Sequence, residues 1–380
     1  MPTAQIRFAD ALSGLRDLPD NSVDAVVTDP PYGLTGVSVK KLTSAIVEWT
    51  SGDRAFIPGG KGFMGRDWDR FVPPPALWDE VYRVLKPGGY LVSFAGARTL
   101  DLMGLSIRLA GFEVRDILAW IRADSFPKAP HTLKPGHEPV VMARKALDGT
   151  VAENNAKWGT GGLNIDDSLT PYVSEEDEAE SKTKNRHGDF GTRHGGNDVF
   201  GDFGTGLRDN YDPQGRKPAN TLLSVEAAAG LDAAYPSSTS RKGKPRASAK
   251  AGDGWGMTAT GTEHNDSGGP SRFFPRIDEA LDDIDLEMQR FAYAGRAPVR
   301  EKPVGDDGTK HVTVKPLSVM EWLVRLVAPH GGLVLDPFAG SGTTLEAAVN
   351  LGRDAIGFEA HEPYIQLCEK RLDRAGATRP

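Results

Sequence analysis

Apolar and polar positions predict alternating strands and helices over the first 145 residues. A mostly apolar run at 23–28 predicts a buried strand, and 75–85 has the spacing of a helix with one apolar face. Lys86-Pro87-Gly88-Gly89 is typical of a helix terminator. Further apolar segments predict a strand over 90–94, a helix over 98–110 and strands over 112–121 and 140–143. Such alternation is typical of a parallel, doubly wound α/β sheet.

The same alternation returns near the other end of the chain. Pro316 suits the first turn of a helix whose apolar side chains recur on one face. The pattern then predicts a strand over 333–335, a helix over 343–351, a strand over 355–358 and a closing helix over 364–372. They form a βαβ unit. Between about 150 and 300, Gly, Asp, Ser and Asn dominate, and the acidic run 174–180 most simply predicts a solvated loop.

Composition narrows the class of protein. The 380 residues are too many for an ordinary single domain, and the one cysteine, Cys368, excludes an intramolecular disulfide. His187 and His194 lack suitable partners for zinc, so no metal is expected. No segment is apolar enough to cross a membrane and the first residues are no signal peptide, so a cytosolic location is expected.

Net charge leaves the question of a polyanionic partner open. The formal value of -7 gives no support to such a partner, but an acidic protein can still carry a local basic face. The segment 241–246, Arg-Lys-Gly-Lys-Pro-Arg, is a candidate for that face, and a solvated loop is the alternative interpretation.

A first motif, Asp29-Pro30-Pro31-Tyr32, closes the buried strand at 23–28. Ligands bind at this carboxyl edge of open α/β sheets. A carboxylate and a backbone carbonyl can accept the two N–H bonds of a planar amine, and consecutive prolines stiffen the chain and expose carbonyls. Tyr32 offers a flat face for stacking. The motif therefore favours a site for a planar amine or amide, with an ordinary Asp-Pro-Pro turn as the alternative.

A second motif, 336–344, follows the strand at 333–335 and reads Asp-Pro-Phe-Ala-Gly-Ser-Gly-Thr-Thr. Gly340 and Gly342 allow a tight turn and close approach to a ligand, and the next helix points free N–H groups at it. Glu359 ends the next strand 19 residues after Gly340, near the ~20-residue distance typical of a carboxylate on ribose hydroxyls. Neither a Gly-x-Gly-x-x-Gly pattern nor a Walker lysine is present. The motif therefore favours a nucleoside-type cofactor over a dinucleotide or a nucleoside triphosphate.

Together, the two motifs resemble those of the amino-type DNA methyltransferases that depend on S-adenosylmethionine. Their order is similar to the circularly permuted β class, and segments 158–166 and 215–220 are similar to phage and prophage relatives. The resemblance covers about 1–145 and 305–375. It implies a Rossmann-like, doubly wound, mostly parallel sheet with a large loop-rich insertion. The implied parts are 1–148, which binds the base, 149–304, which recognises the target, and 305–380, which binds the cofactor.

The resemblance also implies a role for each residue of the motifs. Asp29 and the Pro30 carbonyl would bind the target amine, and Tyr32 would stack on a base flipped out of the duplex. The segment 311–316 resembles the family's His-Pro-Thr-x-Lys-Pro element, with Val312 in place of the usual proline. In that element, Lys315 would pair with the carboxylate of the cofactor. Asp10 matches a position that contacts the cofactor's adenine, with a helix N-cap as the alternative. The remaining implied cofactor contacts are Asp336, Pro337, Phe338, Gly340, Ser341, Gly342 and Thr343, with Glu359 on the ribose.

Three further segments have both a functional and a plain interpretation. The segment 62–69 resembles a loop near the substrate, in which Phe63 and Trp68 either help close the site or anchor the loop to the core. Gly-Asp-Phe-Gly, at 188–191 and 201–204, predicts either a disordered surface loop or a loop that faces DNA. His137-Glu138 is interpreted as sheet packing.

The predicted reaction is direct methyl transfer to adenine N6 in double-stranded DNA, because the family tends to pair an initial Asp with adenine. Cytosine N4 is the close alternative, and RNA or another planar amine is disfavoured by the motif order. A catalytically silent DNA-binding protein is the alternative from another class. Family analogy suggests a homodimer, and the existence of a restriction endonuclease partner is left open. The strands before Asp29 and Asp336 are expected to be neighbours.

Overall fold

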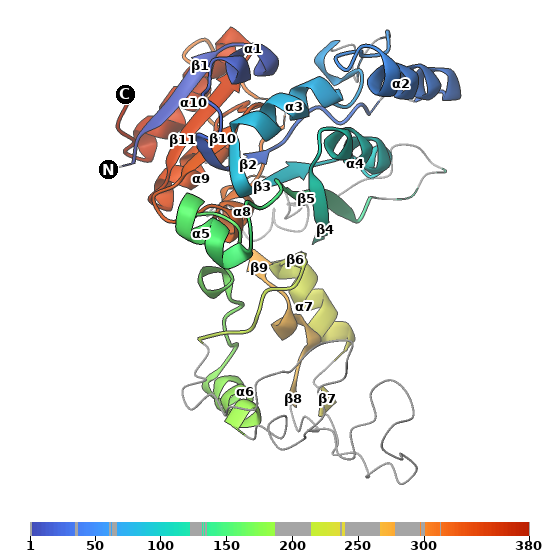
Figure 1. Ribbon diagram of the computed structural model, residues 1–380. Coiled ribbons are helices and arrows are strands. Elements are labelled where there is room, and N and C mark those ends of the chain that lie inside the picture. The colour runs from blue at the N-terminus through green and yellow to red at the C-terminus, as the bar shows by residue number, and fades with distance from the viewer. Residues whose placement is uncertain are drawn as a thin grey trace. The chain divides into compact units, whose positions relative to one another are not determined.

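The computed structural model describes residues 2–34, 37–60, 62, 67–121, 131, 133, 135–186, 214–235, 238–239, 267–277, 297, 301–311 and 313–379 (Figure 1). The chain forms two compact units. The first comprises Met1–Ser168, Asn220–Ala227 and Arg276–Pro380, and the second comprises Leu169–Ala219 and Ala228–Pro275. The predicted insertion at 149–304 therefore shares residues with both units, and its role in target recognition stays a prediction.

The first unit holds the main sheet. Its strands are β1 (Ala4–Phe8), β2 (Val23–Thr28), β3 (Leu85–Phe94), β4 (Glu113–Ile121), β5 (His137–Arg144), β6 (Thr221–Ser224), β9 (Arg276–Ile277), β10 (Leu333–Asp336) and β11 (Asp354–Glu359). Its helices are α1 (Ala11–Arg16), α2 (Val39–Ser51), α3 (Pro75–Val84), α4 (Leu100–Leu109), α5 (Val151–Trp158), α8 (Leu317–Val327), α9 (Thr343–Asn350) and α10 (Glu362–Arg374).

The second unit holds α6 (Glu175–Arg186) and a short antiparallel pair, β7 (Ser238–Thr239) with β8 (Ser267–Gly268). Helix α7 (Val225–Ala234) contains residues of both units. The prediction of a loop over the acidic run 174–180 was wrong, because α6 starts at Glu175. Acidic side chains in a first turn favour a helix through its dipole, and the Ser174 hydroxyl accepts the Asp177 N–H at 3.2 Å.

The sheet has the order β1-β11-β10-β2-β3-β5-β4-β6-β9. Neighbouring strands in this sheet are parallel, except that β5 runs antiparallel to both β3 and β4. The predicted mostly parallel, doubly wound α/β sheet is therefore confirmed. Strands β2 and β10 pair in register, Ala25 with Val334 and Val26 with Leu335, which confirms that the two motif-bearing strands are neighbours.

Two apolar layers cover the sheet. Val26 of β2 belongs to one core cluster, together with Trp78 of α3 and Met103 of α4. Val27 belongs to the other cluster, together with Leu323 of α8 and residues of α9. Every residue of β2 is buried, as expected for a central strand with helices on both faces. This layered core fixes the carboxyl ends of β2, β10 and β11 along one edge.

Two surface properties follow from the described residues. No helix among them is long and apolar enough to cross a membrane.

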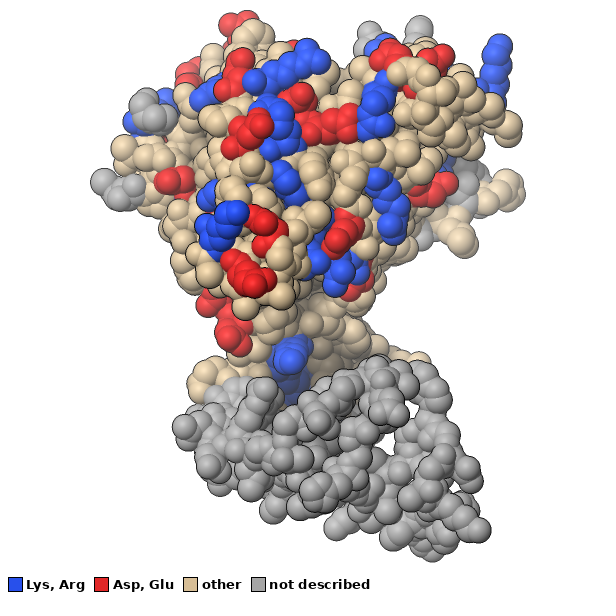
Figure 2. Space-filling view, viewed as in Figure 1, with Lys and Arg blue, Asp and Glu red and all other residues tan. Residues whose placement is uncertain are grey.

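On the face shown in Figure 2, Lys and Arg side chains are interspersed with Asp and Glu. The basic segment at 241–246 and the Gly-Asp-Phe-Gly repeats lie outside the described residues.

Candidate active site

The first motif forms a loop directly after β2. The Tyr32 hydroxyl donates to Oδ1 of Asp29 at 2.6 Å. Lys315 Nζ donates to Oδ2 of Asp29 at 2.5 Å and to the Tyr32 hydroxyl oxygen at 3.0 Å. Pro30 is buried and Pro31 is partly buried. We call the segment 29–33 the base turn, after the role that the sequence predicts for it.

Lys315 comes from the segment before α8 and is 12% exposed. Its ammonium also lies 3.6 Å from Oε2 of Glu138 and 4.7 Å from the centre of the Phe94 ring. Two carboxylates and the rings of Phe94 and Tyr32 thus surround one cation. The structure places Lys315 at Asp29, while its predicted contact with a cofactor stays a prediction.

Glu138 therefore does more than the sheet packing assigned to it from the sequence. It stands on β5, whose first residues lie at the edge where β3 ends with Phe94. The antiparallel direction of β5 brings Glu138 to the site. No local pattern predicts that direction, because it depends on pairing with β3.

Asp69 also holds the base turn. It is the last residue of the segment 62–69, but the sequence assigned no role to Asp69 itself. Oδ1 of Asp69 accepts the backbone N–H groups of Tyr32 and Gly33, both at 2.9 Å. The Thr99 hydroxyl donates to the Tyr32 carbonyl at 2.6 Å. Trp68, next to Asp69, is 57% exposed, so this indole does not anchor its loop to the core. Phe63, its predicted partner in the loop, lies outside the described residues.

Asp336 links the two motifs. The Thr28 hydroxyl at the end of β2 donates to its Oδ1 at 2.7 Å, and the Thr344 hydroxyl donates to its Oδ2 at 2.6 Å. The Phe338 N–H also donates to Oδ1, at 3.0 Å. Burial raises the pKa of Asp336 to about 6, although these hydrogen bonds favour the ionised form. The carboxylate thus orients the turn, while its predicted contact with a cofactor stays a prediction.

The second motif turns tightly between β10 and α9, and we call 336–343 the cofactor turn. Gly340 and Gly342 have φ values of 55° and 84°, in the left-handed region that favours glycine. A Cβ at Gly340 would lie 2.9 Å from the ring of His311. Phe338 is partly buried, whereas Pro337, Ser341 and Thr343 are buried.

Glu359 closes the cofactor turn from the end of β11. Its Oε2 accepts the Gly340 N–H at 2.9 Å, and its Oε1 accepts the His361 N–H at 2.7 Å. Burial raises the pKa of Glu359 above its ordinary value. Burial lowers the pKa of nearby His311 to about 4, so this imidazole is neutral at pH 7.

The end of β1 lies beside Glu359. The Ala9 N–H donates to the Glu359 carbonyl at 3.1 Å. Asp10 is the N-cap of α1, where its Oδ1 accepts the N–H groups of Leu12 and Ser13. This is the alternative role considered for Asp10, at the same edge as Glu359. Its predicted contact with the cofactor stays a prediction.

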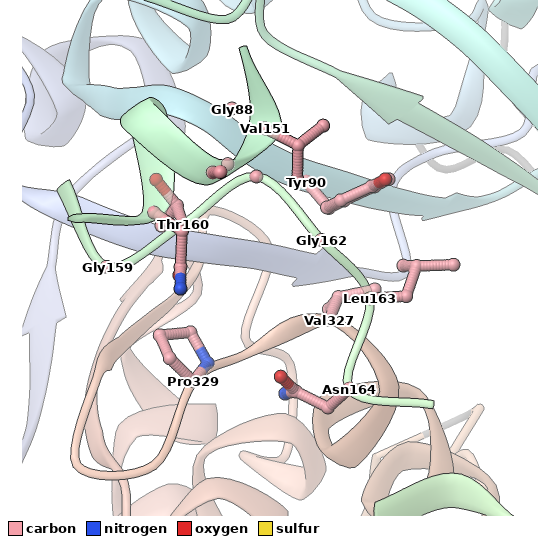
Figure 3. Close-up of a pocket in the computed structure, with 14 residues that line it drawn as sticks. Gly88, Tyr90, Val151, Gly159, Thr160, Gly162, Leu163, Asn164, Val327 and Pro329 are labelled. Carbon is pink, nitrogen blue, oxygen red and sulfur yellow. The ribbon is translucent and has the colours of Figure 1, made fainter. Parts of the chain in front are cut away.

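A separate cavity of about 440 Å³ lies beside the beginning of β3. Figure 3 shows its wall of Gly159, Thr160, Gly162 and Leu163, with Val327 and Pro329 among its other lining residues. Because the base turn follows the far end of the parallel strand β2, this cavity is distinct from the edge that carries both motifs. Among the described residues no group of three or more His, Cys, Asp or Glu side chains could hold a metal ion.

A family model described as "DNA methylase" matches residues 23–370. Type II methyltransferase M.HindIII from Haemophilus influenzae is 46% identical over 67 residues, which cover 18% of this chain and 22% of that protein. DNA adenine methyltransferase YhdJ from Escherichia coli is 40% identical over 70 residues, covering 18% of this chain and 24% of that protein. The matched stretches thus span about a quarter or less of these two relatives.

Solved structures are similar at lower identity. TTHA0409 from Thermus thermophilus, in complex with S-adenosyl-L-methionine, is 19% identical with a TM-score of 0.44. That alignment covers 100% of this chain and 98% of TTHA0409. The cytosine-N4-specific PvuII DNA methyltransferase is 14% identical with a TM-score of 0.47, and the alignment covers 97% of this chain and 86% of that one.

Proposed function

The chain belongs to the DNA methylase family, and we propose that it transfers a methyl group from S-adenosylmethionine to adenine N6 in double-stranded DNA. One observation carries the proposal: the base turn and the cofactor turn follow neighbouring parallel strands. Thr28, the residue directly before the base turn, donates a hydrogen bond to Asp336 of the cofactor turn. Direct transfer requires two substrates to be held side by side, and adjacent sites on a rigid sheet edge supply that proximity.

The cofactor turn fits S-adenosylmethionine in two respects. Gly340 and Gly342, with φ values of 55° and 84°, form a tight turn that a ligand can approach closely. Glu359 presents a partly buried carboxylate suited to ribose hydroxyls. When bound, the cofactor supplies an electrophilic methyl group. The residues proposed to surround it are Asp10, Pro337, Phe338, Gly340, Ser341, Gly342, Thr343 and Glu359, with Asp336 acting through the shape of the turn.

The base turn fits an exocyclic amine. The Asp29 carboxylate and the Pro30 carbonyl accept the two N–H bonds, which localises the lone pair on the nitrogen. Positive charge then grows on that nitrogen as the methyl group arrives, and the Asp29 carboxylate stabilises it. Lys315 fixes the Asp29 carboxylate and the Tyr32 hydroxyl relative to each other. The excess proton leaves the amine after transfer.

The base must leave the duplex to reach a turn at the edge of the sheet, since the amine of a paired base lies inside the helix. Tyr32 then provides the stacking face. The insertion at 149–304 is proposed to read the target sequence. The family includes enzymes that methylate adenine N6 and cytosine N4, so cytosine N4 is the second candidate.

Mass spectrometry of nucleosides tests the proposal. DNA of varied sequence is incubated with the protein and methyl-labelled S-adenosylmethionine, and the nucleosides are then analysed. Labelled N6-methyladenine is the expected product. Labelled N4-methylcytosine would keep the site and change the base. Absence of label from all DNA, with cofactor binding shown by calorimetry, would overturn the proposal.

A further inference from the structure

Asp69 accepts the backbone N–H donors of the base turn. Pro30 and Pro31 have no N–H, so Tyr32 and Gly33 supply the donors of residues 30–33. Both donate to one atom, Oδ1 of Asp69, at 2.9 Å each. Asp69 is 4% exposed, and it ends a short 3-10 helix, Asp67–Asp69. A buried carboxylate oxygen from a distant loop therefore satisfies the backbone donors of this segment.

The peptide group between Tyr32 and Gly33 is also hydrogen-bonded at its carbonyl. The Thr99 hydroxyl, at the start of α4, donates to the Tyr32 carbonyl at 2.6 Å. Gly33 has a φ of 62°, and a Cβ there would lie 2.9 Å from the backbone of Phe71 and Val72. The chain that follows Asp69 thus lies directly against the turn. Tyr32 is fixed through its backbone, independently of the bonds made by its hydroxyl.

We propose that Asp69 is a positioning residue for the target base. By accepting both N–H groups, it leaves the Asp29 carboxylate and the Pro30 carbonyl to face the incoming amine as acceptors. Without Asp69, a partly buried donor and a buried donor lose their partner. The Asp29 carboxylate and the Pro30 carbonyl of the same segment are acceptors that can replace it. Those donors then compete with the amine, and the Tyr32 ring loses its fixed direction. The inference rests on the proposed methyl transfer.

A pair of substitutions separates this role from general support of the fold. Asp69→Ala removes the acceptor, whereas Asp69→Asn keeps a side-chain oxygen that can accept both N–H groups. Turnover is measured on DNA with saturating S-adenosylmethionine, and cofactor affinity is measured by calorimetry. Thr99→Val removes the bond to the carbonyl and serves as a second, independent change to the same peptide.

Asp69→Ala should lower kcat by about 100-fold, the scale of a ~1 Å misplacement in an active site. Its affinity for S-adenosylmethionine should match wild type, because the cofactor turn is held by Glu359. Asp69→Asn should recover most of the lost turnover, and Thr99→Val should lower kcat in the same direction as Asp69→Ala.

Three results would overturn the role of Asp69. Asp69→Ala could turn over at the wild-type rate, or Asp69→Asn could be as slow as Asp69→Ala. Cofactor affinity and turnover could also fall together in Asp69→Ala, which would mean general support of the fold. A wild-type protein that binds the cofactor and methylates no DNA is a different result. It would remove the proposed function, and this inference with it.

Discussion

The base turn and the cofactor turn lie at the ends of neighbouring strands, yet their contacts come from different distances along the chain. In the cofactor turn, Asp336 binds Thr344 8 residues away, and Glu359 binds Gly340 19 residues away. In the base turn, Asp69 and Thr99 bind Tyr32 from 37 and 67 residues away. One turn is shaped largely by its own βαβ unit, whereas the other is shaped by the rest of the fold.

Asp29→Ala should separate the two turns most completely. Methyl transfer should fall by about 1000-fold or more, the upper range for removing a group that stabilises developing charge. Binding of S-adenosylmethionine should stay at the wild-type value, because Asp29 belongs to the base turn. Single-turnover transfer and calorimetry measure the two quantities, with exposed Asp306→Ala as the control. Near-normal transfer would remove Asp29 from the reaction.

Asp336→Asn should alter the hydrogen bond between Thr28, directly before the base turn, and the cofactor turn. Its effect should appear in how the free energy of unfolding depends on pH. The pKa of Asp336 is about 6 in the folded protein and about 3.9 in an unfolded chain. Between these values the folded state binds a proton that the unfolded state does not. The contribution of Asp336 is therefore fully present below about pH 4 and is lost as pH rises through about 6, by up to about 3 kcal/mol.

Denaturant unfolding at pH 4 and pH 7.5 measures this contribution to the free energy of unfolding. The wild type should gain stability at the lower pH relative to Asp336→Asn, because the amide does not titrate and the other groups are shared. An identical pH dependence in the two proteins would mean that Asp336 does not hold a raised pKa.

Glu359→Ala should break the cofactor turn alone. Affinity for S-adenosylmethionine should fall by about 1–3 kcal/mol, the scale of hydrogen bonds to a charged group. Glu359→Gln keeps an oxygen for the Gly340 N–H and should lose less. Calorimetry with S-adenosylhomocysteine measures both without turnover. Unchanged affinity in the alanine variant would place the ribose contact elsewhere.

Lys315→Met should show whether this lysine supports the base turn or the cofactor. Its ammonium binds Asp29 and Tyr32, so kcat should fall by about tenfold, on the order of one charged hydrogen bond. Cofactor affinity should change less than kcat, and Lys315→Arg should retain part of the rate. If affinity for the cofactor falls more than kcat, Lys315 serves the cofactor carboxylate instead.

The contrast in contact distance explains what could be predicted from the sequence. Continuous apolar runs predicted β2, β10 and β11, and the motif order predicted that β2 and β10 are neighbours. Gly340, Gly342 and Glu359 were identified because their spacing is local. Strand β1, which is buried only at Ala4 and has an exposed Phe8 (62%), carries no such run and was missed.

The parts that escaped prediction depend on tertiary structure. Asp69 and Thr99 act on backbone groups many residues away, so neither leaves a local pattern. Glu138 was assigned to the sheet because the antiparallel direction of β5 is decided by its partner, β3. The strand β3 also starts at Leu85, within the predicted helix. Leu85 pairs with Val23 of β2, and the next residue, Lys86, forms an ion pair with buried Asp24 at 2.6 Å.

The bond from Thr28 to Asp336 joins residues 308 positions apart, and this separation governs when the site can form during synthesis. At ~5–20 residues per second, a ribosome needs roughly 15 to 60 seconds to travel from one residue to the other. During that interval β2 lacks its partner β10, so an edge of the central sheet stays unpaired. Until β10 is made, that edge presents unpaired backbone groups with which another strand can pair wrongly.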